Sequence, residues 1–350
     1  MNKLAEKGAF ISKSEAAILQ AVAVMLMVWH HLFGFPDRIN VPYVLVFDRL
    51  FHIETIMGYF GRICVAVFAF VSGYGMRKKA VNSGKTKLLS GYHSIASQLL
   101  KSFSRYWAVF CLFIPIGFLL KVYPVDGIRF LKGLLGNGVG YNGEWWYVDY
   151  YIRLLLLFPV VTLLADVIQR YVPFLVHILI AAAIVTVAFF AERIPNYGFV
   201  TVLLCFAQGM YFVDNRLFET LYQLFLNKSW FRLGTGSVLF GVVFILRFFG
   251  TPDFLLVALF VFSVMLMLKA DFVIRYINPV LRFVGKYSTY IWLAHTFFGY
   301  YFFQRLTFMP RYSWLIFLWC MVLSIASGIV LEGMLTLICK SVRKMFTHRK

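Results

Sequence analysis

Long apolar stretches are the feature that most constrains this chain. A helix needs about 20 mainly apolar residues to cross a bilayer. We count ten such stretches, at residues 15–34, 57–76, 98–120, 144–165, 172–191, 196–213, 229–248, 251–269, 284–304 and 312–339. The sequence therefore predicts an all-α, polytopic integral membrane protein with about ten transmembrane helices.

The composition leads to the same class. Hydrophobic residues make up 61% of the 350 residues and charged residues only 14%, whereas a soluble domain is about half apolar and a quarter charged. Five cysteines lie within apolar stretches without CxxC spacing, which is typical of small buried apolar residues. We therefore expect neither a disulfide framework nor a metal cofactor. The composition predicts that the lipid bilayer surrounds the helices.

The net charge of +19 is set by where the basic residues lie. They occupy short segments between apolar stretches, which argues against a nucleic-acid partner. With a cytoplasmic N-terminus, the inside segments hold 21 Lys and Arg residues and the outside segments nine. Because Lys and Arg are enriched on the cytoplasmic side, we predict that both termini are cytoplasmic, in the cell membrane.

The domain organisation follows from these segments. Residues 1–14 form a cytoplasmic N-terminal tail, residues 15–340 one membrane domain, and residues 341–350 a basic cytoplasmic tail. Every connecting segment is short, so we expect no soluble domain. No P-loop, HExxH, GxSxG or Gly-rich dinucleotide turn is found in the sequence.

Two adjacent histidines, His30 and His31, end the first apolar stretch. An imidazole in an apolar helix loses its hydration, so it needs a partner or a role. It also titrates near neutrality, which suits proton transfer. His31 lies about 24 Å along the helix from Glu15, at 1.5 Å per residue, near the external surface. A structural pair held by neighbouring helices is the alternative interpretation.

A second candidate cluster begins the fourth stretch. Aromatic and charged residues alternate in NGEWWYVDYYIR, with Glu144 between them. An interfacial aromatic belt explains the aromatic residues, and an aromatic, polar mouth that stacks a sugar ring explains the whole set. The candidate substrate-binding residues are His30, Trp145, Trp146, Tyr147, Asp149, Arg153 and His295. His295 is expected on the same external half of the membrane as His31.

A basic pair lies near the cytoplasmic start of the third stretch. Lys101 and Arg105 are one helical turn apart. They either extend toward the lipid headgroups or bind a phosphate-bearing ligand. Ser72 and Gly73 in the second stretch permit close backbone approach to a neighbouring helix or a ligand. Glu332 is an acidic residue within the tenth stretch, either a helix-pairing partner or part of a polar pocket.

Four stretches, in this order, resemble the acyltransferase-3 family of membrane acyltransferases: LQAVAVMLMVWHHLF, VFAFVSGYG, NGEWWYVDYYIRLLLLFPVV and LRFVGKYSTYIWLAHTFF. The resemblance implies transfer of an acyl group, often acetyl, from cytoplasmic acyl-CoA to a hydroxyl of an extracytoplasmic glycan or lipid-linked sugar. It implies that His31 is catalytic, as general base or as acyl carrier. It also implies that Lys101, Arg105 and Ser72 contact the acyl-CoA.

The sequence departs from the family pattern at two places. The family has a basic residue eleven positions before the histidine, and this chain has Gln20 there. The spacing of Lys101 and Arg105 differs from that of the family's basic pair. A transporter or flippase for a glycan or lipid would use the same intramembrane polar residues, and a sensor or structural membrane protein is the third alternative.

Overall fold

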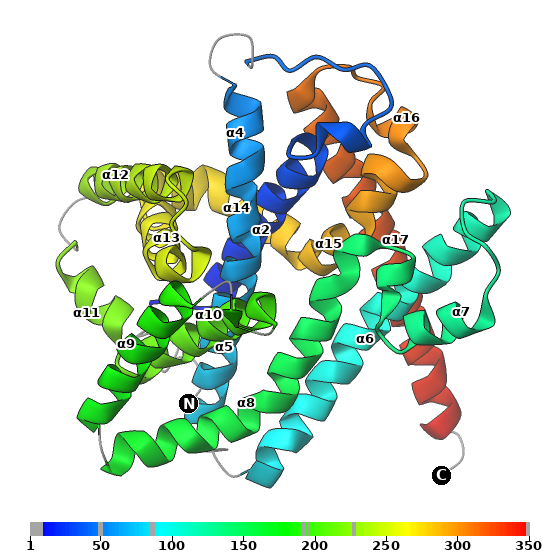
Figure 1. The fold of residues 1–350 in the computed structure, drawn as a ribbon. Helices are drawn as coiled ribbons and strands as arrows, with labels where there is room; N and C mark the ends of the chain where they lie inside the picture. The colour runs from blue at the N-terminus through cyan, green and yellow to red at the C-terminus, as the bar shows by residue number, and fades with distance from the viewer. Residues whose placement is uncertain are drawn as a thin grey trace. The chain divides into compact units, whose positions relative to one another are not determined.

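The computed structural model of the 350-residue chain describes residues 10–47, 52–83, 88–171, 173–190, 193–194, 196–225 and 229–347. Within these ranges the structure is helical and contains one isolated β-bridge, between Val44 and Tyr312. The predicted all-α class is confirmed (Figure 1). Residues 1–9 and 348–350 of the predicted tails lie outside the described residues, and the domain boundaries stay predictions.

The longer helices are α2 (Lys13–Phe33), α4 (Ile53–Phe60), α5 (Cys64–Ser83), α6 (Leu88–Leu119), α7 (Gly127–Leu134), α8 (Trp146–Tyr171), α9 (Pro173–Phe189), α10 (Tyr197–Asp214), α11 (Leu217–Gln223), α12 (Ser229–Phe248), α13 (Asp253–Leu268), α14 (Asn278–Lys286), α15 (Ser288–Thr296), α16 (Gln304–Thr307) and α17 (Ser313–Thr347). Short 3-10 turns are η1 (Pro36–Arg38), η2 (Gly61–Ile63), η3 (Gly138–Gly140) and η4 (Gly143–Trp145). Two π-helical segments are η6 (Val273–Ile277) and η7 (Phe297–Tyr301).

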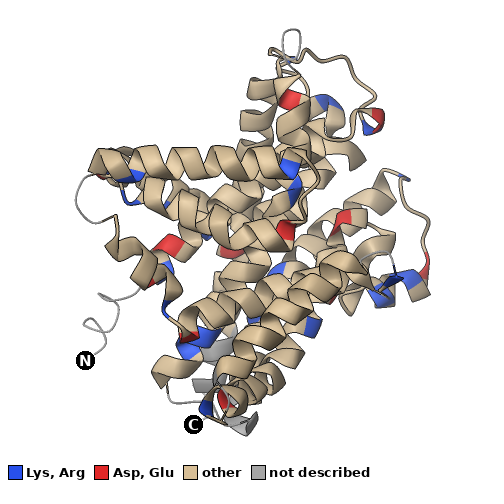
Figure 2. Cartoon of the chain, turned by 60° about the vertical axis from the view of Figure 1, so that its left-hand side comes forward, with Lys and Arg blue, Asp and Glu red and all other residues tan. Residues whose placement is uncertain are grey.

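Seven helical segments of the described residues are long and apolar enough to cross a bilayer, or eight if a bent pair counts as one span. They are Lys13–Phe33, Ile53–Ser83, Tyr92–Leu119, Gly143–Tyr171, Tyr197–Asp214, Ser229–Phe248 and Ser313–Ser341, and the bent pair is Asp253–Leu268 with Val273–Lys286. The multi-pass class is therefore supported. The count of ten and the cytoplasmic termini stay predictions. Most of the ribbon carries no charged residue (Figure 2).

The eighth predicted stretch, 251–269, corresponds to α13, and the structure differs from the prediction in the connection after it and in the ninth stretch. The segment 269–286, expected as a cytoplasmic loop, is mostly helical in η6 and α14, and it bends by 91° from α13. Its basic residues share an amphipathic helix with apolar residues. They lower the mean hydropathy of the segment, so the sequence predicts a loop there. The stretch 284–304 is not one helix: α14 ends at Lys286, and α15 is followed by the π-helical η7.

Both ends of α2 follow local sequence signals. The Ser12 amide donates to Glu15 Oε2 at 2.7 Å, and the Glu15 amide donates to Ser12 Oγ at 3.2 Å. This is the capping box that the sequence contains, and it satisfies two amides of the first turn. The helix ends at Phe33, and Pro36, which cannot continue an α-helix from the residues before it, begins η1.

The described residues divide into two compact units. Unit 1 comprises the chain up to Ala23 with Ile63–Ile95 and Tyr150–Lys286, and unit 2 comprises Val24–Arg62, Ala96–Asp149 and Tyr287–Lys350. In unit 1, α5 packs closely on α10. A Cβ at Gly73 would lie 2.0 Å from the Phe206 carbonyl oxygen. The glycine is therefore required for this approach, in agreement with the packing interpretation of Ser72-Gly73.

A buried group of three charged residues lies in unit 1, near the C-terminal ends of α5, α8 and α10. Arg77, with 3% of its side chain exposed, donates from Nε to Asp214 Oδ1 at 2.7 Å and from NH2 to Asp166 Oδ1. We name these three residues the Arg77 cluster. A buried cation in a helix needs such partners, because its desolvation is otherwise uncompensated. The cluster therefore joins three helices.

In unit 2, the loop after η1 is fixed by a buried carboxylate. Glu54 of α4 is fully buried. It accepts hydrogen bonds from the amides of Val46 and Phe47, at 2.7 and 2.9 Å, and from the Ser313 hydroxyl at 2.6 Å. Charge-assisted bonds of this kind compensate for burying the carboxylate. They hold the loop that follows Arg38 against the start of α17.

Candidate active site

His31 lies at the C-terminal end of α2 and bridges two other segments of unit 2. Its Nδ1 lies 2.7 Å from His295 Nε2 of α15, and its Nε2 lies 3.2 Å from Glu144 Oε2 of η4. The side chain is 10% exposed and that of Glu144 15%. We name His31, His295, Glu144, Arg38 and Tyr300 the His31 cluster. Segments far apart in the sequence therefore meet around one imidazole.

The hydrogen-bond partners assign the protons of both histidines. His295 Nδ1 lies 2.9 Å from the carbonyl oxygens of Ile291 and Trp292. Carbonyls only accept, so Nδ1 of His295 carries the hydrogen and its Nε2 is the acceptor. His31 therefore donates from Nδ1 to His295. The other ring nitrogen, Nε2 of His31, is left to exchange a proton with Glu144.

Glu144 is held as a carboxylate by two further donors. Arg38 NH1 donates to Glu144 Oε1 at 2.8 Å, and the Tyr300 hydroxyl donates to the same oxygen at 3.0 Å. The pKa of the Arg38 guanidinium is raised: burial opposes its charge, but the hydrogen bond to Glu144 and the attraction of Tyr300 and Glu144 outweigh burial. At 3.2 Å, Nε2 of His31 and the Glu144 carboxyl group are close enough to share one proton.

His30 points to a different neighbour. Its Nδ1 lies 2.7 Å from the carbonyl oxygen of Gly58 in α4. Residues adjacent on a helix point about 100° apart, so the two imidazoles face different sides of α2. Here α4 comes very close to the end of α2, because a Cβ at Gly58 would lie 3.0 Å from the Gly34 amide nitrogen. His30 joins α2 to α4, and its predicted substrate contact stays a prediction.

The predicted aromatic residues have unequal positions. Trp145 is fully buried, donates from Nε1 to the Leu293 carbonyl and packs edge-on against Phe297. A ring enclosed in this way packs the core and anchors Glu144 beside it. Tyr147 is also buried, and Trp146 is half-buried.

The charged residues of the same stretch follow on α8. Asp149 is half-buried, and Arg153 is exposed with its guanidinium over the Phe199 ring. Asp149 lies in unit 2 and Arg153 in unit 1. Asp149 and Arg153 are spaced i,i+4 in the sequence, which permits a pair on one helix face; that pair and the predicted sugar contacts of this stretch stay predictions.

The basic pair of α6 has two different environments. Lys101 is exposed. Arg105 is half-buried, its Nε lies 3.6 Å from Glu332 Oε2, and its guanidinium lies over the Tyr290 ring. The Tyr290 hydroxyl donates to the same Glu332 oxygen at 2.6 Å. Glu332 therefore pairs helices α6, α15 and α17, which agrees with one of the two interpretations of this acid. Ser72 lies half-buried on α5, in unit 1.

Sequence reasoning missed three members of the His31 cluster. The sequence pattern places Glu144 in the aromatic, polar cluster but does not connect it with His31, and it gives no site role to Arg38 or Tyr300. Each of the three is polar at the end of an apolar stretch, where interfacial residues are common. Their contacts with His31 or with one another span 106 to 262 positions of sequence, so no local pattern connects them.

The fold and the site define a multi-pass membrane protein with a buried histidine–carboxylate cluster at the end of α2. The chain belongs to the acyltransferase-3 family, because the model of that family's acyltransferase domain matches residues 16–333, nearly the whole chain. Family membership makes it a membrane acyltransferase in the broad sense. Neither the curated proteins nor the solved structures contain a match to this chain.

Proposed function

We propose that the protein transfers an acyl group, acetyl in the first instance, from cytoplasmic acyl-CoA to a hydroxyl of an extracytoplasmic glycan or lipid-linked sugar. The observation that carries the proposal is the position of His31 between His295 and Glu144, at 2.7 and 3.2 Å. An imidazole oriented by one partner and paired with a carboxylate is an arrangement suited to general base catalysis. The enzyme then lies in the cell membrane as a multi-pass protein.

The donor–acceptor assignment identifies the reacting nitrogen. Nδ1 of His31 donates to His295, so Nε2 takes the proton of the acceptor hydroxyl. Glu144 holds the hydrogen that it shares with Nε2, so Nε2 is able to accept the hydroxyl proton. The hydroxyl oxygen then attacks the thioester carbonyl carbon, and the carbon–sulfur bond breaks. The departing thiolate takes a proton from the imidazolium, which balances the step.

A covalent route uses the same nitrogen. In that route Nε2 of His31 attacks the thioester, carries the acyl group and passes it to the acceptor. The two routes differ in what happens without an acceptor. An acyl-histidine releases one equivalent of CoA in a burst, whereas general base catalysis releases none. Rapid-mixing measurements of CoA release by the purified protein distinguish them.

For the donor we propose contacts with Lys101 and Arg105. Helix α15 connects this region to the reacting centre, because it carries both Tyr290, which Arg105 covers, and His295, which His31 contacts. Five residues separate the two positions, an axial rise of about 7.5 Å. A long, flexible donor with phosphates at one end suits such a separation. The contact proposed for Ser72 has no comparable structural support.

The experiment measures base-labile acetate on surface glycans of cells that carry the wild-type protein, the His31→Ala variant or no copy of the protein. We expect acetate only with the wild-type protein. The variant must reach the membrane at the wild-type level. Equal acetate in all three would contradict the proposed reaction. Loss of glycan export without loss of acetylation per glycan would favour the transporter alternative.

A further inference from the structure

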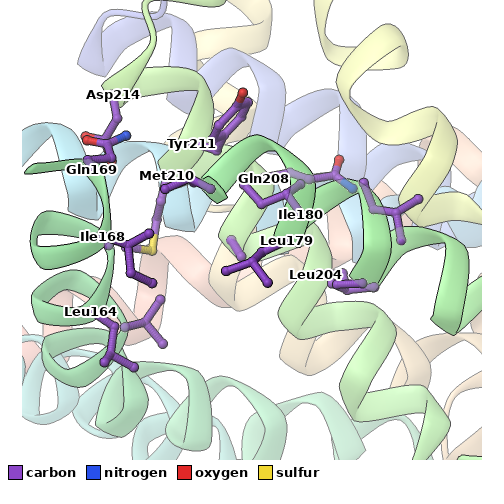
Figure 3. Close-up of a pocket in the computed structure, with 16 residues that line it drawn as sticks. Leu164, Ile168, Gln169, Leu179, Ile180, Leu204, Gln208, Met210, Tyr211 and Asp214 are labelled. Carbon is purple, nitrogen blue, oxygen red and sulfur yellow. The ribbon is translucent and has the colours of Figure 1, made fainter. Parts of the chain in front are cut away.

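A cavity of about 300 Å³ lies in unit 1 between α8, α9 and α10. Its walls are almost entirely aliphatic, and Leu164, Leu179, Ile180 and Leu204 are among the residues that line it (Figure 3). Gln169 and Asp214 lie next to each other at one end, and Leu204 lies at the opposite end. Two further polar residues, Gln208 and Tyr211, line the cavity, and the Gln208 side chain donates to the Phe254 carbonyl. Asp214, the charged residue of the lining, lies at one end.

The lining indicates the kind of occupant. Ordered water requires two to four polar partners per molecule, which a mainly aliphatic wall does not provide along its length. A hydrocarbon chain suits such a wall, because it supplies the packing contacts that unfilled apolar volume lacks.

The polar end indicates the headgroup. The Arg77 cluster adjoins it through Asp214 and holds one guanidinium against two carboxylates, a formal excess of one negative charge. Arg77 NH1 is buried without a hydrogen-bond partner. Arg170 follows Gln169 on α8 and is exposed. An ammonium group complements the excess at Asp214, and a phosphate complements Arg170.

We propose that this cavity binds one acyl chain of a zwitterionic aminophospholipid, of the phosphatidylethanolamine class, with its headgroup at Gln169 and Asp214. The site belongs to unit 1 alone and requires nothing of the acyl-transfer reaction. The lipid chain completes the packing of α9, most of whose residues are exposed in the absence of lipid. This site is independent of the acyl-CoA and acceptor contacts proposed above.

Two neighbouring alanines of α9 provide a matched pair of variants. Ala183 lines the cavity, and Ala182, also exposed, does not. We expect Ala183→Phe to fill part of the cavity and to reduce bound phosphatidylethanolamine at least tenfold. Ala182→Phe adds the same ring to the same helix and is expected to leave binding unchanged. Native mass spectrometry of the full-length protein, from an equimolar mixture of phosphatidylethanolamine and phosphatidylglycerol, measures the bound lipid.

Three results would overturn the proposal. They are equal binding of the two lipids, equal effects of the two variants, and a second protein chain in place of lipid on the wild-type protein. A photoactivatable phosphatidylethanolamine tests the wild-type chain directly, should Ala183→Phe fail to fold. We expect its label on α8, α9 and α10, and a label confined to other helices would also overturn the site.

Discussion

The His31 cluster and the Arg77 cluster both place charged groups inside largely apolar helical units, but they bond differently. Arg77 is 3% exposed, and its ion-pair partners among the described residues are the carboxylates of Asp166 and Asp214. The His31 cluster is a chain that runs from His295 through His31 and Glu144 to Arg38, whose side chain is 37% exposed. The Arg77 guanidinium is buried, whereas the His31 cluster ends at a partly exposed guanidinium.

The difference indicates which cluster holds protein structure and which exchanges protons. A guanidinium does not lose its proton in proteins, so Arg77 stays charged and its ion pairs hold the helices together. An imidazole and a carboxylate 3.2 Å apart can exchange the proton between them. The comparison therefore predicts that changes in the Arg77 cluster lower stability and that changes in the His31 cluster lower the rate of acyl transfer.

The largest expected effect is that of His31→Ala on acyl transfer. Loss of a general base typically costs about a hundredfold to ten-thousandfold in rate. We expect His30→Ala, whose imidazole contacts the Gly58 carbonyl instead, to keep most of the activity per folded molecule. Acyl transfer by both purified variants, normalised to folded protein, provides the measurement. If His31→Ala retained near-normal transfer, the role given to this cluster would be wrong.

Arg77→Met is expected to affect stability rather than rate. It leaves the carboxylates of Asp166 and Asp214 without their cation, and removing one partner of a buried ion pair costs about 3–5 kcal/mol. Thermal unfolding in detergent should show a large decrease in the midpoint. The rate per folded molecule should stay at the wild-type value.

A triple variant sharpens this test. Arg77→Met combined with Asp166→Asn and Asp214→Asn removes all three charges, so no charge remains buried without a partner. We expect it to recover much of the lost stability. If Arg77→Met folded normally but lost acyl transfer, the distinction between the two clusters would fail.

Glu144→Gln should lower the rate while leaving stability nearly unchanged. Glutamine has the same shape but no charge, so it stabilises the His31 imidazolium less. Hydrogen bonds to charged groups contribute about 1.5–3 kcal/mol, which corresponds to a rate loss of roughly tenfold to a hundredfold. The rate and the unfolding midpoint are measured on the same preparation. A larger loss of stability than of rate would give Glu144 a structural role like that of the Arg77 cluster.

The sequence predicted the elements that depend on local chemistry. The spacing of Ser12 and Glu15 marks a capping box, and Pro36 marks the end of the first helix. Both signals depend on neighbouring residues alone, and the structure contains both features. The prediction of a loop at 269–286 was wrong, because the segment is mostly helical. Charges on one face of an amphipathic helix lower the mean hydropathy and hide the helix.

The site was predictable only in part. His31 and His295 could be placed at similar depth, since helix geometry sets depth along a span. The proximity of Glu144, Arg38 and Tyr300 depends on how helices distant in sequence pack, which no local pattern specifies. Trp145 shows the converse limit: its aromatic pattern suggested a sugar contact, and its ring is fully buried in the core of unit 2.

The smallest expected effect is that of changes at Lys101 and Arg105, the residues proposed to contact the acyl donor. Lys101 is exposed, and Arg105 already pairs with Glu332 at 3.6 Å, so a donor phosphate competes with a carboxylate and with solvent. Exposed charge pairs contribute only about 0.2–1 kcal/mol each. Replacing both residues with Gln should therefore raise the KM for acetyl-CoA by about threefold to tenfold, with little change in kcat. Glu332→Gln alone removes the competing carboxylate and should lower that KM. Steady-state kinetics of the three proteins at fixed acceptor measure both constants, and a KM that is unchanged in both variants would assign the basic pair to the lipid headgroups.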